Sequence, residues 1–259
     1  MSIYTLGIDV GSTASKCIIL KDGKDIVAKS LVDVGTGTSG PARSIAEVLE
    51  NAHMKKEDMA FTLATGYGRN KVPFADENIS EISCHAMGVH VTDPSVKAII
   101  DIGGQDVKVI HVENGTMTNF QMNDKCAAGT GRFLDVMANI LEVKVSDLAA
   151  LGAKSTKRVA ISSTCTVFAE SEVISQLSKG TDKIDIIAGI HRSVASRVIG
   201  LANRVGVVKD VVMTGGVAQN YGVREALEEG LGVEIKTSPL AQYNGALGAA
   251  LYAYKKAVK

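Results

Sequence analysis

The segment LGIDVGST, residues 6–13, is an apolar run that ends in Asp-x-Gly and two hydroxyl residues. The same outline returns as IIDIGGQD at residues 99–106, so that Asp9 corresponds to Asp101. In both places the β-branched run stops at a glycine and resumes as a second apolar run, which predicts a β-hairpin with a tight turn. We therefore expect a fold that is duplicated along the chain.

Each repeat continues in the same way beyond its first hairpin. Asp22-Gly23 in the first repeat and Asn114-Gly115 in the second are dipeptides that suit two-residue hairpin turns, because both central positions of such a turn have positive φ. A third strand is therefore expected in each repeat.

The rest of the chain shows helical spacing interrupted by short apolar runs. Pro41 suits the first turn of a helix. The expected helices cover residues 39–51, 79–91, 131–141, 168–178, 182–205, a segment ending near residue 229, and 244–254, and the expected single strands cover residues 61–66, 210–214 and 233–236. Strands alternating with helices indicate the α/β class.

The length of 259 residues exceeds the usual size of one domain, which favours two domains. We expect an N-terminal domain over residues 1–95 and a C-terminal domain over residues 96–259. For the last helix, packing back on the N-terminal domain is an open alternative. Hydrophobic residues make up 46% and charged residues 22% of the chain, which is typical of globular proteins.

The charge pattern argues against a nucleic-acid partner. The 28 basic residues balance the 28 acidic ones, and no basic cluster interleaves with aromatic residues. No apolar run approaches the length of a membrane helix, and the start lacks the charged region of a signal peptide. We expect a soluble, cytoplasmic protein that binds no nucleic acid and no membrane.

The two Asp-x-Gly turns have the chemistry of phosphate-binding loops. Glycine lets the backbone approach a phosphate, successive N–H groups form an anion-binding concavity, and Ser12 and Thr13 add hydroxyl donors. Two such turns could clamp a polyphosphate, with Asp9 and Asp101 holding Mg²⁺ through its waters. The alternative is that these glycines only make tight β-turns in a protein that binds no nucleotide.

A third glycine segment, TGGV at residues 214–217, follows a predicted strand. The three segments together resemble the phosphate-1, phosphate-2 and adenosine motifs of the acetate kinase, sugar kinase, Hsp70 and actin superfamily. That resemblance implies a duplicated actin-like (ribonuclease H-like) ATPase fold with two domains around a nucleotide cleft, and Asp9, Asp101 and Gln105 as the residues that position the hydrolytic water. It implies ATP or ADP contacts from Gly11, Ser12, Thr13, Ala14, Ser15, Lys16, Gly103, Gly104, Gly215, Gly216, Gln219 and Gln242.

Two of the four cysteines, Cys126 and Cys165, lie just ahead of predicted helix N-termini. The positive end of a helix stabilises a thiolate or an anionic cluster. A [4Fe–4S] cluster takes four thiolates, which a two-fold dimer of a chain with two ligands supplies. The alternative of two unconnected core cysteines stays open, and Cys17 and Cys84 are expected to be core residues.

Four motifs point to a narrower family: NDKCAAGTGRF at residues 123–133, STCTVFAESE at 163–172, TGYGR at 65–69 and CHA at 84–86. They are similar to the activators of 2-hydroxyacyl-CoA dehydratases, and ATPase subunits of benzoyl-CoA reductases share much of the pattern. Apart from CHA, the stretch 71–97 matches least.

This second resemblance implies an ATPase that works in anaerobic amino-acid fermentation. A homodimer would share one [4Fe–4S] cluster through Cys126 and Cys165 of both subunits, with ferredoxin or flavodoxin as electron donor. The dimer would pass one electron to the dehydratase, component D, whose expected substrate is (R)-2-hydroxyglutaryl-CoA. The alternatives are an ATPase subunit of a benzoyl-CoA reductase, a small-molecule kinase, and an actin-like or Hsp70-like mechanical ATPase.

Overall fold

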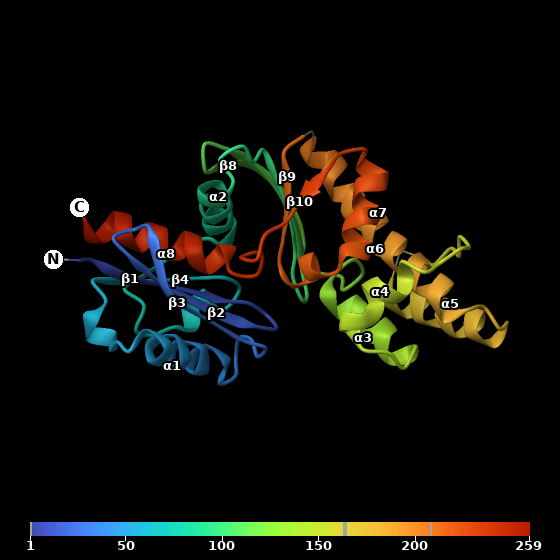
Figure 1. Cartoon of the computed structure of the whole chain (residues 1–259), viewed down its shortest axis with the longest axis horizontal. Coiled ribbons are helices and arrows are strands. Elements are labelled where there is room, and N and C mark those ends of the chain that lie inside the picture. The colour runs from blue at the N-terminus through green and yellow to red at the C-terminus, as the bar shows by residue number, and fades with distance from the viewer. Residues whose placement is uncertain (1, 163–164, 208) are drawn as a thin grey trace. The chain divides into compact units, whose positions relative to one another are not determined.

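The structure is a computed structural model that describes residues 2–162, 165–207 and 209–259 (Figure 1). It divides into two compact units. The first contains the chain up to Val96 together with Val112–Thr118 and Pro239–Lys259, and the second contains Lys97–His111 and Asn119–Ser238. The C-terminal segment thus groups with the first unit. The domain assignment at residues 1–95 and 96–259 stays a prediction.

The first unit is built on a five-stranded sheet of order β3-β2-β1-β4-β5. Strand β1 runs antiparallel to β2 and parallel to β4. Its strands are β1 (Tyr4–Val10), β2 (Ser15–Lys21), β3 (Asp25–Val32), β4 (Phe61–Thr65) and β5 (Glu77–Asn78), and its helices are α1 (Gly40–Ala52), α2 (Glu81–Thr92) and α8 (Asn244–Ala257), with short 3₁₀ turns at Lys56–Asp58 and Arg69–Lys71.

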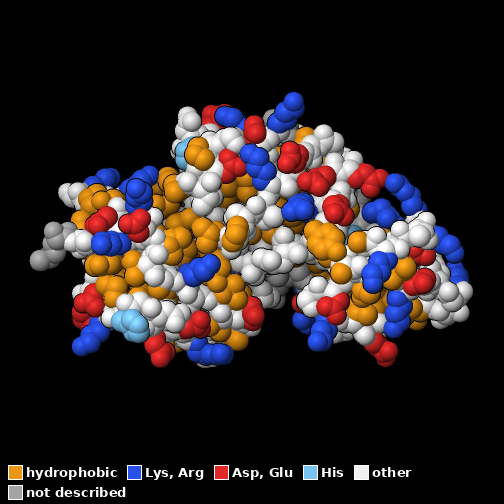
Figure 2. Space-filling view, viewed as in Figure 1, with side chains coloured by type: hydrophobic (Ala, Val, Ile, Leu, Met, Phe, Trp, Pro, Cys, Tyr) orange, Lys and Arg blue, Asp and Glu red, His pale blue; other side chains and the backbone are white. Residues whose placement is uncertain are grey.

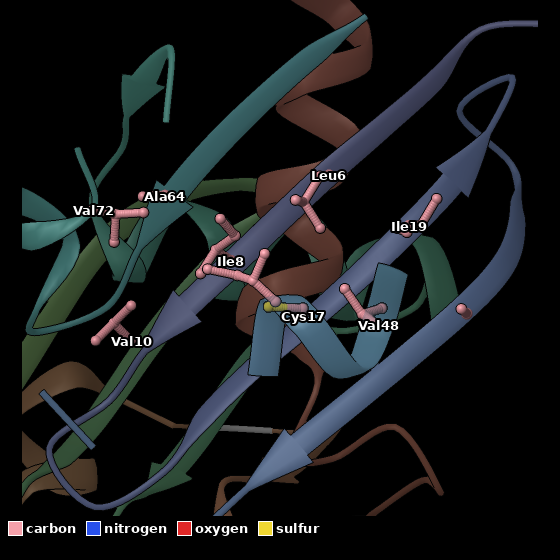
Figure 3. Close-up of a cluster of buried hydrophobic side chains, with 10 residues drawn as sticks. Leu6, Ile8, Val10, Cys17, Ile19, Val48, Ala64 and Val72 are labelled. Atoms are coloured by element: carbon pink, nitrogen blue, oxygen red, sulfur yellow. The ribbon is translucent and has the colours of Figure 1, made fainter. Parts of the chain in front are cut away.

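Successive residues of a strand point to opposite faces of the sheet. Both faces of this sheet carry apolar side chains, and helices cover both of them. Figure 3 shows the cluster on the α1 side, where Ile8, Cys17 and Val48 pack together at zero exposure. On the opposite face Ile18 and Leu20 of β2 pack against α8. A sheet buried on both faces explains why β1 and β2 read as continuous apolar runs.

Glycines allow α8 to lie unusually close to its neighbours. A Cβ on Gly7 of β1 would collide with the backbone of Ala246 and Ala250, and a Cβ on Gly248 would collide with the carbonyl of Cys84 in α2. The C-terminal helix therefore packs backbone to backbone on β1 and α2, which brings its N-terminal end near the carboxyl end of β1.

The second sheet, of order β10-β9-β6-β7-β8, repeats this plan and belongs to the second unit apart from the β7–β8 turn region at Val112–Thr118. Strand β6 runs antiparallel to β7 and parallel to β9, as β1 does with its neighbours. Its strands are β6 (Ala98–Ile102), β7 (Val107–Glu113), β8 (Thr116–Asn123), β9 (Val211–Thr214) and β10 (Ile235–Lys236), and its helices are α3 (Gly131–Ile140), α4 (Leu148–Gly152), α5 (Thr166–Ser178), α6 (Lys183–Val205) and α7 (Tyr221–Leu231), with 3₁₀ turns at Val145–Asp147 and Gly216–Gln219. The predicted duplicated α/β fold is confirmed.

Both predicted two-residue turns are present. Asp22 and Gly23 have φ of 52° and 66°, and Asn114 and Gly115 have φ of 50° and 75°. Positive φ at both central positions is the geometry that matches the twist of the flanking strands.

The surface gives no sign of a single charged patch on the face shown in Figure 2, where Lys and Arg side chains alternate with Asp and Glu. In the part of the chain that the structure describes, no helix combines the length and the apolar character needed to cross a membrane.

Candidate functional site

The first glycine turn, between β1 and β2, is held in shape by the backbone. The Gly11 N–H donates to the carbonyl of Ala14 at 2.9 Å, which closes the turn, and the Thr36 N–H donates to the Gly11 carbonyl at 2.9 Å. Ser12 is partly buried and Thr13 is exposed at the tip. These two hydrogen bonds fix the backbone of the turn, which carries the hydroxyl groups of Ser12 and Thr13.

Asp9 lies buried at the end of β1, directly opposite Lys16 in the strand register. The Lys16 Nζ is 3.2 Å from Asp9 Oδ2. Two glycines leave room for the carboxylate: a Cβ on Gly245 would lie 2.9 Å from Asp9 Oδ2, and a Cβ on Gly66, whose φ is 88°, would collide with Oδ1. The first unit thus holds one acidic and one basic group beside its turn.

The TGYGR motif packs against this same strand end. The Gly68 N–H donates to the Val10 carbonyl at 2.8 Å, and Arg69 Nη1 donates to the Gly66 carbonyl at 3.1 Å. Arg69 is thus held at Gly66, the glycine that lies beside the Asp9 carboxylate.

The second turn, between β6 and β7, reproduces the first. The Gly103 N–H donates to the carbonyl of Asp106 at 2.9 Å, which matches the bond from Gly11 to Ala14. Gly104 is partly buried and Gln105 is exposed at the tip. The two Asp-x-Gly segments are therefore alike in conformation as well as in sequence.

Asp101 is buried at the end of β6 and both of its oxygens are engaged. Lys108 Nζ lies 3.2 Å from Asp101 Oδ2, and Thr214 Oγ1 donates to Asp101 Oδ1 at 2.7 Å. Lys108 also contacts Asp106 Oδ2 at 2.8 Å. Three strands, β6, β7 and β9, thus contribute to one polar cluster in the second unit.

The segment after β9 has the same arrangement as the segment after β4. Gly215 has a φ of 85°, and a Cβ there would lie 3.0 Å from Asp101 Oδ1. The predicted adenosine contacts Gly216 and Gln219 are exposed residues of the 3₁₀ turn that follows. Gln242 is partly buried ahead of α8 and belongs to the first unit.

The turn at Gly103 is hydrogen bonded to the helix that follows the first cysteine loop. The N–H groups of Gly131 and Arg132, the first two residues of α3, donate to the carbonyls of Gly103 and Gly104 at 2.9 and 2.8 Å. Two backbone hydrogen bonds therefore join the turn directly to the start of α3.

Cys126 lies in the loop between β8 and α3. Asn123 Nδ2 donates to the Cys126 carbonyl at 2.9 Å, and Thr130, the residue before α3, donates through its Oγ1 to the Ala127 carbonyl at 2.7 Å. Gly129, at a φ of 88°, turns the chain into the helix. Cys126 is thus separated from α3 by one further turn of the loop.

Cys165 is the residue immediately before α5, with extended φ and ψ of −150° and 144°. Helix α6 holds the loop ahead of it: Asp185 accepts hydrogen bonds from Ser155 Oγ at 2.8 Å and from two backbone N–H groups at 3.1 Å, and Ser193 Oγ donates to the Ser162 carbonyl at 2.8 Å. The hydrogen bond from Ser155 lowers the pKa of the Asp185 carboxyl. Ser163 and Thr164 of the STCTVFAESE motif lie outside the described residues.

The structure separates the four cysteines into two kinds. Cys17 and Cys84 are buried, and burial raises the pKa of both thiols to about 12, so neither is expected to form a thiolate. Cys126 and Cys165 are partly exposed and both belong to the second unit, where α3 and α5 are in contact. Within residues 2–162, 165–207 and 209–259 no group of three or more His, Cys, Asp or Glu side chains is arranged to hold a metal ion.

Sequence reasoning missed Asp106, Lys108 and Thr214 as members of the site. One signal was that a lysine follows each aspartate after seven residues, Lys16 after Asp9 and Lys108 after Asp101. In the structure both lysines lie opposite their aspartate across a hairpin. A second signal was the dipeptide Thr-Gly at residues 65–66 and 214–215, whose threonine is the last residue of β4 and of β9. The ion pair to Asp106 had no signal of its own.

The comparison with protein families matches residues 6–253 to the model of the BadF/BadG/BcrA/BcrD ATPase family. The chain is 90% identical over 260 residues to the (R)-2-hydroxyglutaryl-CoA dehydratase activating ATPase of Acidaminococcus fermentans, and the alignment covers 100% of both sequences. The crystal structure of (R)-2-hydroxyglutaryl-CoA dehydratase component A from the same organism superposes with a TM-score of 0.97, covering 99% of this chain and 100% of that one.

Two further solved structures have a fold similar to that of this chain. The activator of 2-hydroxyisocaproyl-CoA dehydratase from Clostridium difficile, solved with bound ADPNP, is 54% identical with a TM-score of 0.96, covering 99% of this chain and 96% of that chain. The ethanolamine utilization protein EutJ from Carboxydothermus hydrogenoformans is 14% identical with a TM-score of 0.63, covering 96% and 90%. Its likeness concerns the fold alone, and the predicted actin-like fold is confirmed.

Proposed function

Because the chain belongs to the BadF/BadG/BcrA/BcrD ATPase family, we propose that it uses ATP hydrolysis to activate a 2-hydroxyacyl-CoA dehydratase, component D, by passing it one electron. The substrate of that partner in this proposal is (R)-2-hydroxyglutaryl-CoA, since the relative that is 90% identical is named for it. One observation carries the proposal: a phosphate-type turn is hydrogen bonded to the helix that follows a candidate cluster cysteine.

The two turns receive the phosphates of ATP in this proposal. The segments Gly11 to Lys16 and Gly103 to Gly104 contact the phosphates through the N–H and hydroxyl groups that the two turn-closing bonds leave available, and Lys16 supplies a positive charge. The segment Gly215, Gly216 and Gln219, together with Gln242, contacts the adenosine. The support for these roles is the equal geometry of the two turns and the membership in an ATPase family.

The carboxylates of Asp9 and Asp101 fit Mg²⁺, because carboxylate oxygens and water are the ligands that this cation prefers. Each carboxylate is fixed by a lysine at 3.2 Å on the opposite strand. Asp9, Asp101 and the exposed Gln105 orient the water that attacks the terminal phosphate.

Cys126 and Cys165 fit the thiolate ligands of a [4Fe–4S] cluster, since both are partly exposed cysteines of one unit on loops held by neighbouring elements. Two copies of the chain supply the four thiolates. When bound, the cluster would supply a one-electron carrier at low potential. Hydrogen bonds from α6 and from Asn123 fix the backbone of the two loops that carry these cysteines.

Coupling between the nucleotide and the cysteines follows from the bonds that join Gly103 and Gly104 to α3. A phosphate bound at the turn favours one arrangement of its backbone, and the start of α3 must follow because its first two N–H groups are bonded there. Such a shared element is what links two sites energetically.

The setting proposed for this activity is an anaerobic cytoplasm. A homodimer accepts an electron from ferredoxin or flavodoxin and docks on the dehydratase during amino-acid fermentation. As a free homodimer it differs from an ATPase subunit of a benzoyl-CoA reductase, which would be isolated in a stable complex.

The test is anaerobic purification of the full chain with iron and sulfide analysis, an absorbance spectrum and the mass of the assembly. We expect about four irons per dimer, lost in Cys126→Ser and in Cys165→Ser while ATP binding is retained. Cys17→Ala is the control, because this buried thiol is not a proposed ligand, and it should keep its iron.

A colourless chain that binds ATP but takes up no iron after anaerobic reconstitution would contradict the proposal. Phosphate transfer to a small acceptor by such a chain would favour the kinase alternative.

A further inference from the structure

The two halves of the molecule carry the same ion pair at the same place. Asp9 and Lys16 are register partners in the first hairpin, and Asp101 and Lys108 are register partners in the second. In both pairs the lysine Nζ lies 3.2 Å from Oδ2 of the aspartate. Side chains directly opposite each other on one face of a hairpin are close enough to interact.

The surroundings of the two lysines differ. The side chain of Lys16 is 16% exposed and pairs with Asp9, whereas that of Lys108 is 3% exposed and lies between Asp101 and Asp106. The residue of the first turn that corresponds to Asp106 is Ala14, because each supplies the carbonyl that closes its turn. The second carboxylate is therefore an addition of the second repeat.

This added carboxylate lies over the phosphate-type turn. A Cβ on Gly103 would be 2.5 Å from Asp106 Oδ1, while Asp106 Oδ2 is 2.8 Å from Lys108. Asp101 is fixed from the other side by Thr214 at 2.7 Å. Lys108 thus contacts both carboxylates, and that of Asp106 lies against Gly103, the glycine that a phosphate would approach.

We propose that Lys108 is a positioning residue that holds Asp101 and Asp106 as a pair of acceptors for the hydrated Mg²⁺ of the bound nucleotide. This inference rests on the proposed function, since it requires a magnesium nucleotide at the second turn. Asp106 is then a further site residue, and the two equivalent lysines have different tasks.

Charge explains this division of tasks. A lysine buried between two carboxylates cannot leave without bringing two unpaired negative charges close together, which is strongly unfavourable. Lys108 therefore stays in place when the nucleotide binds. Lys16 is more exposed and is the lysine that can follow a phosphate.

The experiment compares binding of ADPNP with Mg²⁺ and with EDTA, using the full chain purified anaerobically. Lys108→Met should weaken ADPNP binding about 10- to 100-fold with Mg²⁺, the usual effect of removing a group that orients metal ligands, and should leave binding in EDTA unchanged. Lys108→Arg keeps the positive charge between the carboxylates and should restore most of the affinity.

Lys16→Met is the matched variant from the first repeat. Because Lys16 contacts the phosphate itself, its loss should weaken ADPNP binding both with Mg²⁺ and with EDTA. Asp106→Asn is a second variant in case Lys108→Met fails to fold: its side chain is 18% exposed, so the fold should tolerate the change, and the Mg²⁺-dependent part of the affinity should fall.

Wild-type dependence on Mg²⁺ in a folded Lys108→Met variant, or in Asp106→Asn, would overturn the inference and leave Lys108 a structural residue. Equal weakening with Mg²⁺ and with EDTA would also overturn it. If the wild-type chain itself binds no ADPNP in either buffer, the proposed function fails instead.

Discussion

At the scale of single residues, His191 shows how burial sets a property that no motif announces. Its side chain is 3% exposed in α6, and Gly152 and Gly222 approach the ring so closely that a Cβ on either would lie within 3 Å of it. Asn220 Nδ2 lies 3.3 Å from His191 Nε2. Burial, and secondly the charge of Arg192, lower the pKa of His191 to about 4.

Stability should therefore fall in acid. Above pH 6.5 His191 is neutral in both states, but as the pH falls toward 4 the unfolded chain takes up a proton that the folded chain does not. Between pH 6.5 and pH 4 this difference in proton uptake lowers the free energy of unfolding by up to about 3 kcal/mol. Denaturant midpoints measured from pH 7 to pH 4.5 should drop less in His191→Gln, whereas His53→Asn, at an exposed position, should behave as wild type.

At the scale of elements, the close approach of α8 to α2 and β1 depends on glycine. Gly248 of α8 faces the carbonyl of Cys84, and Gly88 of α2 faces the carbonyl of Asn244. These contacts bring the start of α8, with Gly245, beside Asp9. Packing between two helices and a strand thus shapes the surroundings of a site residue.

Gly248→Ala should destabilise the chain by about 1–3 kcal/mol, because the added methyl group meets backbone atoms that cannot move away. The matched control is Gly200→Ala in α6, where a Cβ meets no atom within 4 Å; there alanine should stabilise the helix by about 0.5–1 kcal/mol. Thermal unfolding of both variants checks the pair, and equal effects would refute the packing argument.

At the scale of the whole molecule, the surface beside Cys165 exposes two large apolar side chains. Val167 and Phe168, in the first turn of α5, are 64% and 62% exposed. Large apolar side chains exposed side by side are typical of interaction surfaces. Their position directly after a proposed cluster ligand fits the proposed contact with a second copy of the chain.

Phe168→Glu should therefore weaken the proposed homodimer, because it places a charge in a contact that should be dry. Sedimentation velocity under anaerobic conditions should show more monomer and a lower iron content per chain than in wild type. Val258→Glu, at a 51% exposed position near the C-terminus, is the control and should leave the assembly unchanged. A Phe168→Glu chain with the wild-type mass would argue that this surface faces something else.

Much of the fold could be predicted because the signals are local. The hairpins follow from β-branched runs around Asp-x-Gly, and α6 was expected at residues 182–205 and found at Lys183–Val205 with Asp182 as its cap. Short elements escaped: α4 (Leu148–Gly152) and β5 (Glu77–Asn78) span too few residues to show a period. Helix α5 begins at Thr166, two residues before the predicted start.

In the candidate site, too, residues with a local motif could be predicted and contacts between distant segments could not. Asp9, Asp101, Cys126 and Cys165 could be named from motifs: the aspartates lie at strand ends and Cys165 directly precedes α5, whereas Cys126 lies in the loop ahead of α3. The bond from Thr214 to Asp101 joins residues 113 positions apart, and the bonds from Gly131 to Gly103 depend on how α3 meets the sheet. Such contacts arise only when β6, β7 and β9 pair and α3 packs beside them, because burial and hydrogen bonding between distant segments leave no period in the sequence.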